Sequence, residues 1–270
     1  MTIDTITDAD DPRVVDYRAL RDPELRRTRN LFIAESTEVI RVLLAAQRYR
    51  IRSLLLTPTA FARLRSLVTD QTVLVASKDV LTAITGVQLH RGGLALVERG
   101  IDAGPRDIVR PTTRRLVLLE DVSNPDNIGG IFRTARAFGI DGLLLSPGCA
   151  DPLYRKSVRV SMGASLLVPW ARDPEWPQGM AQLRADGIAI AALTTEATAL
   201  DLEALVTRGV PERLALLLGN EGTGLSPGAR AAADFALTIP MVAGIDSLNV
   251  AAAAAIALHR LRSDSGSGTA

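Results

Sequence analysis

Short apolar runs alternate with amphipathic segments through the first hundred residues of the chain. Apolar runs of strand length lie at residues 31–36, 51–57, 72–76 and 92–98. Segments with helical spacing of apolar positions lie between them, at residues 37–46, 58–68 and 79–85, and one or two charged helices are expected at residues 12–30. This alternation predicts a small α/β domain, which is followed by a glycine- and proline-containing linker at residues 101–111.

The second half restarts the alternation with longer units. Strands are expected at residues 115–121, 142–147, 188–195, 214–219 and 235–240, and helices at residues 127–138, 176–185, 201–206 and 226–233. Strands that are apolar almost throughout are typical of a parallel sheet with helices on both faces. Ligands of such sheets bind beyond the carboxyl ends of the strands. The polar or glycine-rich residues that follow these strands therefore predict a binding site at that edge.

Length and composition predict a soluble protein with one large domain or two modest ones. The 270 residues are enough for two modest domains, and we place the first at residues 1–106 and the second at residues 107–270. A hydrophobic content of 47% with 23% charged residues is ordinary for a globular protein. Cys149 is the single cysteine, so no intramolecular disulfide can form, and residues 1–12 lack both a basic start and an apolar run. We expect a cytoplasmic location.

Arginine supplies nearly all of the positive charge. Lys78 and Lys156 are the only lysines among 31 basic residues, and the net charge is +1. Residues 13–52 hold ten arginines against five acids, and residues 133–172 hold six basic residues against two acids. Guanidinium groups pair with phosphate and stack on bases, so both stretches are candidate RNA-facing surfaces. Genome composition and ordinary solvated helices are the alternative explanation.

Three segments of the second half carry candidate chemistry. The first, NPDNIGGIFRTARAFG at residues 124–139, is a turn followed by a helix. Arg133 follows Asn127 by less than two helical turns, so both can serve one pocket near the N-terminal end of the helix, where free N–H groups favour anions. A capped helix with a surface arginine explains the spacing equally well.

The second segment, LLLGNEGTGLS at residues 216–226, combines three glycines with the carboxylate of Glu221. Glycines let the backbone approach a ligand closely. The spacing matches neither the phosphate-binding P-loop nor the usual dinucleotide fingerprint. On this segment alone, a glycine-rich turn without a function stays open.

The third segment, at residues 237–261, is a short strand ended by Pro240, a turn at Gly244, and a long alanine-rich helix. Asp246 or Ser247 is expected to cap the helix, whose first N–H groups have no partner within it. The small side chains of the helix let other backbone approach closely. Taken alone, the pattern also fits a strand and a buried helix that close a core.

Together, and in this order, the three segments resemble the motifs of the SpoU/TrmH-type branch of the SPOUT RNA methyltransferases, over about residues 115–261. That family transfers methyl groups from S-adenosylmethionine to ribose 2′-hydroxyls. The resemblance implies an α/β fold whose mostly parallel C-terminal sheet ends in a trefoil knot, although knots are exceptional. It also implies a homodimer in which a site can borrow Arg133 from the partner. The first domain is similar to the small ribosomal-protein-like RNA-binding domains that many of these enzymes carry.

The resemblance also assigns site residues. It implies a catalytic set of Asn127, Arg133, Glu221, Ser247 and Asn249. It implies that S-adenosylmethionine is bound, mainly through backbone groups, at Thr194, Leu218, Gly219, Asn220, Gly224, Ile239, Met241 and Leu248. We assign no metal site. Gly130 and Ala251 stand where alanine and serine are frequent in the family, and neither departure affects the catalytic set.

Methyl transfer requires the ribose oxygen to lie in line with the sulfonium methyl group and to lose its proton. His90 and His259 lie away from the three motifs and are expected to be structural or solvated. Arg133 is not a proton acceptor, because a guanidinium group stays protonated in proteins. We expect Arg133 to bind the target phosphate and stabilise the developing alkoxide, while the other four residues position the ribose and one another.

The function that the sequence predicts is an S-adenosylmethionine-dependent RNA ribose 2′-O-methyltransferase. 23S ribosomal RNA is favoured as substrate because the first domain resembles those of ribosomal-RNA enzymes. A transfer RNA substrate stays open. So does a catalytically silent RNA-binding or ribosome-assembly protein of the same fold, although the intact polar set argues against it. The glycine spacing disfavours a nucleotide-dependent oxidoreductase.

Overall fold

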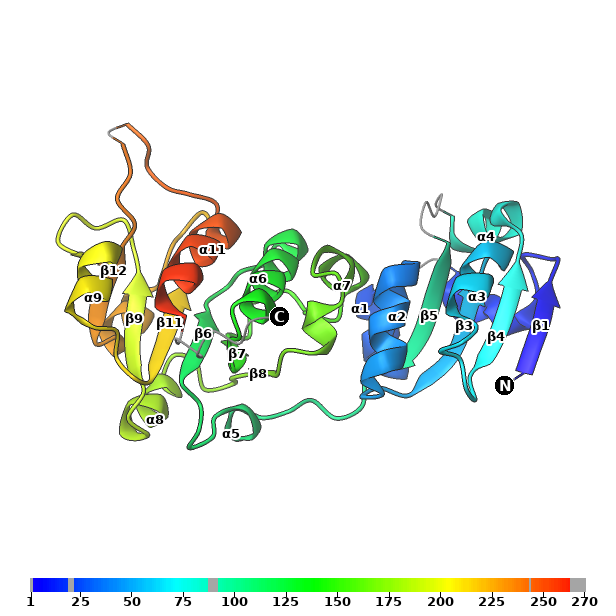
Figure 1. The fold of residues 1–270 in the computed structure, drawn as a ribbon, viewed down its shortest axis with the longest axis horizontal. Helices are drawn as coiled ribbons and strands as arrows, with labels where there is room; N and C mark the ends of the chain where they lie inside the picture. The colour runs from blue at the N-terminus through cyan, green and yellow to red at the C-terminus, as the bar shows by residue number, and fades with distance from the viewer. Residues whose placement is uncertain (1, 19–21, 87–91, 243, 263–270) are drawn as a thin grey trace. The chain divides into compact units, whose positions relative to one another are not determined.

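The structure is a computed structural model that describes residues 2–18, 22–86, 92–242 and 244–262 (Figure 1). The chain packs into two compact units. Unit 1 consists of Met1–Ile101 with Pro152–Leu167, and unit 2 of Asp102–Asp151 with Val168–Ala270. These units are defined by packing, whereas the division predicted at residue 106 concerns RNA binding and catalysis and stays a prediction. His90 lies outside the described residues, as does the C-terminal stretch 263–270.

Unit 1 is built on a mixed five-stranded sheet in the order β1-β4-β3-β5-β2. Its strands are β1 (Thr2–Ile6), β2 (Leu31–Glu35), β3 (Ile51–Leu56), β4 (Thr72–Ala76) and β5 (Gly93–Glu98). β1 and β3 pair in parallel with β4, while β5 pairs antiparallel with β3 and β2. The predicted strands are confirmed to within one or two residues, but β1 was not predicted, because TIDTI is too short and too polar to stand out from the start of the chain.

Side-chain caps define where the main helices of unit 1 begin. Its helical elements are the 3-10 helix η1 (Pro12–Tyr17), α1 (Asp22–Arg29), α2 (Thr37–Ala46), α3 (Pro58–Leu64), α4 (Lys78–Thr85), α7 (Arg155–Val160) and the 3-10 helix η2 (Ala164–Leu166). Ser36, Thr57 and Ser77 each accept a hydrogen bond from the backbone N–H three residues on, which satisfies one of the free donors at a helix start. The expected helix at residues 58–68 is shorter than predicted.

Helix α7 packs against β2 within unit 1, although it comes from the second half of the sequence. The contact includes the carboxylate of Glu35, which is 7% exposed. The guanidinium group of Arg159 lies 3.2 Å from this carboxylate and that of Arg155 lies 3.6 Å from it. A nearly buried carboxylate requires such partners, since an unpaired charge there would be costly.

Unit 2 is built on a seven-stranded sheet whose recorded pairings are all parallel, in the order β10-β12-β9-β11-β6-β7-β8. The predicted parallel sheet is thus confirmed. The strands are β6 (Arg115–Leu119), β7 (Gly142–Leu145), β8 (Trp170–Arg172), β9 (Ala189–Leu193), β10 (Leu200–Asp201), β11 (Leu214–Leu218) and β12 (Phe235–Thr238). β8 and β10 were not predicted, because runs of three and two residues carry no periodic signal.

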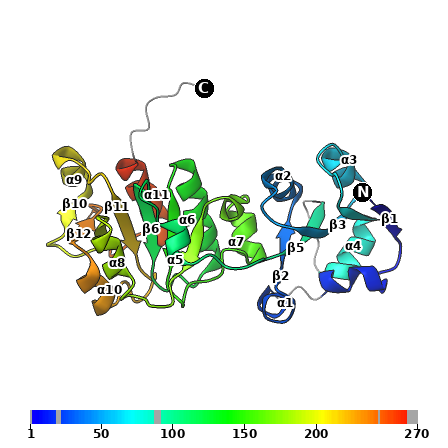
Figure 2. The same ribbon diagram turned by 90° about the horizontal axis from the view of Figure 1, so that it is seen from below.

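Helices cover both faces of this sheet (Figure 2). They are α5 (Pro105–Ile108), α6 (Pro125–Ala137), α8 (Met180–Ala185), α9 (Leu202–Arg208), α10 (Pro227–Ala232) and α11 (Val250–Leu261). α11 packs against α6 and α9 on one face. On the other face, alternate strand residues such as Leu116, Leu118 and Leu217 form a core with side chains of α5, α8 and α10. The helix predicted from residue 176 begins only at Met180, after a series of turns.

The close approach of α6 and α11 depends on small residues. A Cβ atom added to Gly130 would lie 3.1 Å from the Cβ of Ala251, which is tighter than ordinary van der Waals contact. The expectation that the alanine-rich helix admits close neighbours is therefore confirmed at this contact. The far end of α11 is also fixed, because the buried Arg115 donates hydrogen bonds to the carbonyl oxygens of Leu261 and Glu212.

Candidate active site

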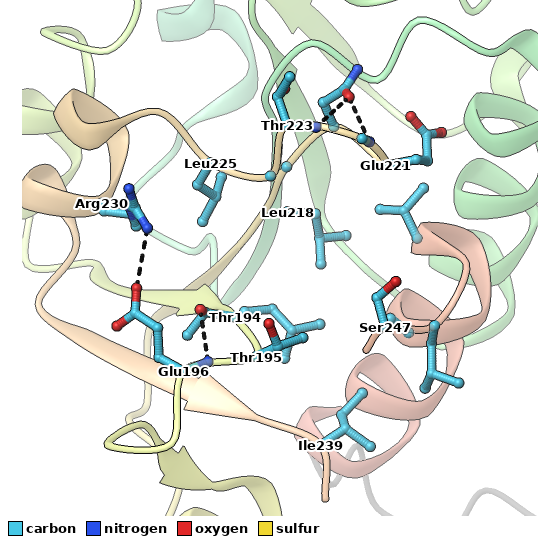
Figure 3. A pocket seen from close by; sticks show the side chains of 18 of the residues that line it. Thr194, Thr195, Glu196, Leu218, Glu221, Thr223, Leu225, Arg230, Ile239 and Ser247 are labelled. Carbon is cyan, nitrogen blue, oxygen red and sulfur yellow. Dashed lines mark hydrogen bonds and ion pairs between the residues drawn. The ribbon is translucent and has the colours of Figure 1, made fainter. Parts of the chain in front are cut away.

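A cavity of about 400 Å³ opens at the carboxyl ends of β9, β11 and β12 (Figure 3). Its walls are the segments that follow these three strands, together with the start of α11. The eight residues that the resemblance assigned to the cofactor all line it: Thr194, Leu218, Gly219, Asn220, Gly224, Ile239, Met241 and Leu248. This is the edge of a parallel sheet at which ligands are expected.

The glycine loop after β11 forms one wall of the cavity, and its shape requires glycine. A Cβ atom on Gly219 would lie 2.6 Å from the carbonyl carbon of Gly224, a separation that real structures do not show. Gly224 itself has φ of +68°, in the left-handed region that favours glycine. The two ends of the loop therefore touch backbone to backbone.

Asn220 holds this loop and links it to the neighbouring strand. Its side-chain oxygen accepts hydrogen bonds from the N–H groups of Gly222 and Thr223, at 2.8 and 3.1 Å. Its side-chain nitrogen donates to the carbonyl oxygen of Asp121, just beyond β6, at 2.8 Å. The loop is therefore held in a fixed shape before any ligand binds.

Three of the five predicted catalytic residues form one hydrogen-bonded chain. The amide nitrogen of Asn127 donates to the carboxylate of Glu221, and the amide nitrogen of Asn249 donates to the side-chain oxygen of Asn127 at 3.0 Å. The oxygen of Asn249 accepts from the N–H groups of Ala251 and Ala252, so Asn249 caps α11. Asp246 and Ser247 were expected as caps, and that expectation is wrong.

This chain has only one orientation. A carboxylate can only accept hydrogen bonds, so Asn127 must turn its NH₂ group toward Glu221. The oxygen of Asn127 then faces Asn249, whose own oxygen is occupied by the helix N–H groups. Each amide is therefore held in one rotamer, which is what positioning a substrate requires.

The other two predicted catalytic residues lie differently. Ser247 lines the cavity beside Leu248 and is exposed. Arg133 lies on α6 with an exposed side chain, and among the residues that the structure describes it has no recorded hydrogen bond or ion pair and does not line the cavity. Within one chain, the structure brings together Asn127, Glu221 and Asn249 but does not join Arg133 to them.

A buried carboxylate that was not predicted anchors the far end of the glycine loop. Glu120, just beyond β6, is 4% exposed. It accepts hydrogen bonds from the indole N–H of Trp176 at 2.8 Å, from the backbone N–H of Ser226 at 2.7 Å, and from the hydroxyl of Ser226 at 2.8 Å. Ser226 also caps α10. No sequence signal pointed to Glu120, because its partners lie far along the chain.

The lone cysteine does not belong to this chemistry. Cys149 is buried, and burial raises the pKa of its thiol. The thiol donates a hydrogen bond to the carbonyl oxygen of Leu119 at 3.2 Å. A buried, protonated thiol is a poor nucleophile. The site therefore offers amide, hydroxyl, carboxylate and backbone groups, which suit positioning rather than covalent catalysis.

Many arginines of the two arginine-rich stretches make ion pairs or hydrogen bonds within the protein. In residues 13–52, ion pairs with nearby acids engage Arg13, Arg18, Arg29, Arg41, Arg50 and Arg52. In the second stretch, Arg159 is paired with Glu35, and Arg172 donates hydrogen bonds to three backbone carbonyl oxygens around Pro147. The count over residues 13–52 did not include Asp4, Asp10 and Glu98, which lie outside this stretch and pair with its arginines.

The fold and the site together define an α/β enzyme class that binds a nucleotide-like cofactor at the edge of a parallel sheet and positions a second substrate with fixed polar side chains. The model of the SpoU rRNA Methylase family matches residues 114–259. This chain belongs to that family and is an RNA methyltransferase.

Similar proteins match nearly the whole chain. An uncharacterized tRNA/rRNA methyltransferase of Mycobacterium bovis is 38% identical over 96% of this chain and 91% of its own length. The 23S rRNA (guanosine(2553)-2′-O)-methyltransferase RlmP of Bacillus subtilis is 27% identical over 95% of this chain and 98% of its own length. The crystal structure of an AdoMet-bound rRNA methyltransferase from Sinorhizobium meliloti has a TM-score of 0.81 at 27% identity, covering 96% of this chain and 97% of that one.

Proposed function

We propose that this protein transfers a methyl group from S-adenosylmethionine to a ribose 2′-hydroxyl of 23S ribosomal RNA. The observation that carries the proposal is the cavity whose lining includes all eight residues assigned to the cofactor, with the Glu221–Asn127–Asn249 chain reaching its edge. The match to RlmP along nearly both full lengths supports ribosomal RNA and the ribose 2′-hydroxyl. When bound, S-adenosylmethionine supplies an electrophilic methyl group.

The cavity fits this cofactor in size and in the chemistry of its walls. Its volume of about 400 Å³ lies within the range of roughly 300–1,000 Å³ that small-molecule sites occupy. Leu218, Ile239 and Leu248 provide apolar surface for an adenine ring, while Gly219 offers backbone that no side chain covers. These residues would hold the cofactor, and Thr194 and Met241 would lie beside it.

The catalytic residues divide the remaining work. Glu221, Asn127 and Asn249 hold the ribose in place, because their mutual hydrogen bonds fix each amide in one orientation. Ser247, on the opposite wall from the glycine loop, offers a hydroxyl to the same space. Arg133 remains charged throughout, so it binds the RNA phosphate and stabilises the negative charge that develops on the 2′-oxygen.

Within one chain Arg133 is not joined to the other catalytic residues, and a homodimer would let it act in the site of the partner. Exposed apolar side chains gather around α11 and the segment before it: Val242 (76% exposed), Ile245 (53%), Leu248 (38%) and Ile256 (42%). Exposed apolar side chains at four positions of one segment are typical of a surface that a partner covers. Arg133 lies on α6, which packs against α11, so a second copy seated on this surface would receive Arg133 close to its own site.

Mixing two inactive variants tests this arrangement. A mixed dimer contains one Asn127→Ala chain and one Arg133→Ala chain. If Arg133 comes from the partner, the site on the Asn127→Ala chain lacks both residues. The site on the Arg133→Ala chain keeps its own Asn127 and receives an intact Arg133, so it is complete. Random reassociation should therefore restore roughly a quarter of the wild-type activity. If Arg133 acts within its own chain, the mixture stays inactive. A monomer in light scattering would contradict the dimer itself.

We also propose the finer features of the fold that the resemblance implies. A trefoil knot is supported by the path of α11, which follows β12 on the far side of β9 and returns to pack against α6. An experimental structure in which the chain does not pass through one of its own loops would contradict the knot. Residues 1–106 are proposed to bind RNA, residues 107–270 are proposed to form the catalytic domain, and the cytoplasm is proposed as the location. No helix in the described part of the chain has the length and apolar character to span a membrane.

Methyl-labelled S-adenosylmethionine tests the reaction and the substrate together. The protein is incubated with the labelled cofactor and, in separate reactions, with transfer RNA, free ribosomal RNA and ribosomal subunits, and the modified nucleotide is mapped. Label on a ribose of 23S RNA is expected, with Arg133→Ala as the inactive control. Label on a base refutes the ribose proposal. Label only in transfer RNA would show that transfer RNA, and not ribosomal RNA, is the substrate. Cofactor binding without any transfer would favour a silent RNA-binding protein.

A further inference from the structure

An ion pair spans the side of the cavity that lies opposite Glu221 and Ser247 (Figure 3). The guanidinium group of Arg230 lies 3.2 Å from the carboxylate of Glu196, and both residues line the cavity. Arg230 comes from α10, which follows the glycine loop, and Glu196 follows β9. The pair therefore joins two walls of the cavity, at a distance from the groups that we assign to methyl transfer.

Stability does not explain this pair. The side chains of Arg230 and Glu196 are 48% and 46% exposed, and ion pairs at such positions contribute little to folding because water screens them. The backbone N–H of Glu196 donates to the hydroxyl of Thr194 at 3.2 Å, which orders the turn that carries the carboxylate. A charged group is thus held at the mouth of a ligand cavity for little gain in stability.

We propose that Glu196 recognises the ribose diol of the adenosine part of S-adenosylmethionine; this inference rests on the proposed function. A carboxylate only accepts hydrogen bonds, and the two hydroxyls of a ribose can both donate to it. In doubly wound sheets, an acid beyond the carboxyl end of a strand binds a cofactor ribose in this way. Glu196 occupies such a position after β9.

The alternatives within the cavity are less suited to the diol. Glu221 is the other carboxylate in the lining, but it lies across the cavity from Glu196 and belongs to the hydrogen-bonded chain that we assign to the target ribose. In Glu196, one oxygen faces Arg230, and within the described residues the second has no recorded hydrogen bond. Arg230 acts through Glu196 as a positioning residue, because the ion pair limits rotation of the carboxylate.

Calorimetric binding to three probes tests the proposal without any turnover. The probes are S-adenosylhomocysteine, 5′-methylthioadenosine, which lacks the amino-acid part, and the 2′-deoxy form of 5′-methylthioadenosine. Glu196→Gln should weaken both ribose-containing probes by about tenfold, because a charged acceptor is lost. The 2′-deoxy probe keeps only the 3′-hydroxyl of the diol, so Glu196→Gln should weaken it less, by about threefold.

Glu203→Gln is the matched control. Glu203 lies on α9 in the same unit, is 59% exposed and is paired with Arg260, but does not line the cavity. It should leave all three affinities unchanged. Weakening of S-adenosylhomocysteine alone by Glu196→Gln overturns the ribose assignment, because the pair then contacts the amino-acid part. Unchanged affinities reduce Glu196 to a surface ion pair. If the wild type binds no probe, the proposed function itself fails.

Discussion

Replacing Glu120 by glutamine tests whether the glycine loop is anchored by a buried charge. The carboxylate accepts three hydrogen bonds, one from Trp176 and two from Ser226, and no ion pair to it is recorded among the described residues. Glutamine has nearly the same shape, so the substitution leaves no cavity. It replaces one acceptor oxygen by an NH₂ group, which can only donate.

The expected cost follows from where that NH₂ group points. In one orientation it faces the backbone N–H of Ser226, and in the other it faces the indole N–H of Trp176. Either way, one buried donor loses its partner and the remaining bonds lose the charge that strengthens them. We expect a loss of about 2–4 kcal/mol in the free energy of unfolding of unit 2. That corresponds to a fall of about 5–10 °C in Tm for a domain of this size.

Thermal and urea unfolding measure the loss, and S-adenosylhomocysteine binding reports on the loop. Glu212→Gln is the matched control, because its side chain is 77% exposed and forms an ion pair with Arg114 at 3.5 Å. Its Tm should change by less than about 1 °C. Affinity for S-adenosylhomocysteine should fall several-fold in Glu120→Gln, since Ser226 ends the loop that lines the cavity. A Glu120→Gln protein as stable as the control would refute the anchoring role.

Substitutions at three residues separate catalysis from binding. Arg133→Ala should abolish methylation but leave the Kd for S-adenosylhomocysteine within a few-fold, because Arg133 does not line the cavity; retained turnover would contradict its role. Asn249→Ala should lower kcat by about 10²-fold or more, because Asn127 loses its orienting partner. Asn249→Ser keeps a capping oxygen for α11, so it should show the same reduced kcat at nearly wild-type stability. Gly219→Ala should weaken S-adenosylhomocysteine binding at least tenfold, because its Cβ would lie 2.6 Å from the carbonyl carbon of Gly224; normal binding by calorimetry would show that the loop yields.

Strands and helices of ordinary length were predictable because each is specified by its own residues. The run LALLL has only one favourable place, the centre of a sheet covered on both faces, and β11 lies there between β9 and β6. The order of the strands was not predictable in the same way. β11 pairs with β6, which lies 99 residues earlier in the register that joins Leu218 to Leu119, and nothing local in either strand encodes that choice.

The same distinction between local and distant signals separates the predicted part of the site from the rest. Gly219, Glu221 and Asn249 stand in segments whose composition marked them, and the structure brings these segments to one cavity. Asn249 nevertheless caps α11 where Asp246 or Ser247 was expected, since several polar residues in a row can each serve as a cap and only the partner of the side chain decides.

Residues that hold the site in place escaped the sequence because their function depends on sheet order. Glu120 and Ser226 are separated by 106 positions, and the side chain of Asn220 reaches the carbonyl oxygen of Asp121 across 99. Both contacts exist only because β6 and β11 are neighbours, which places the segments after them side by side. The cavity is therefore shaped by the pairing of these two strands as much as by the glycine loop. A substitution that loosens this pairing should impair cofactor binding even where every residue that touches the ligand is unchanged.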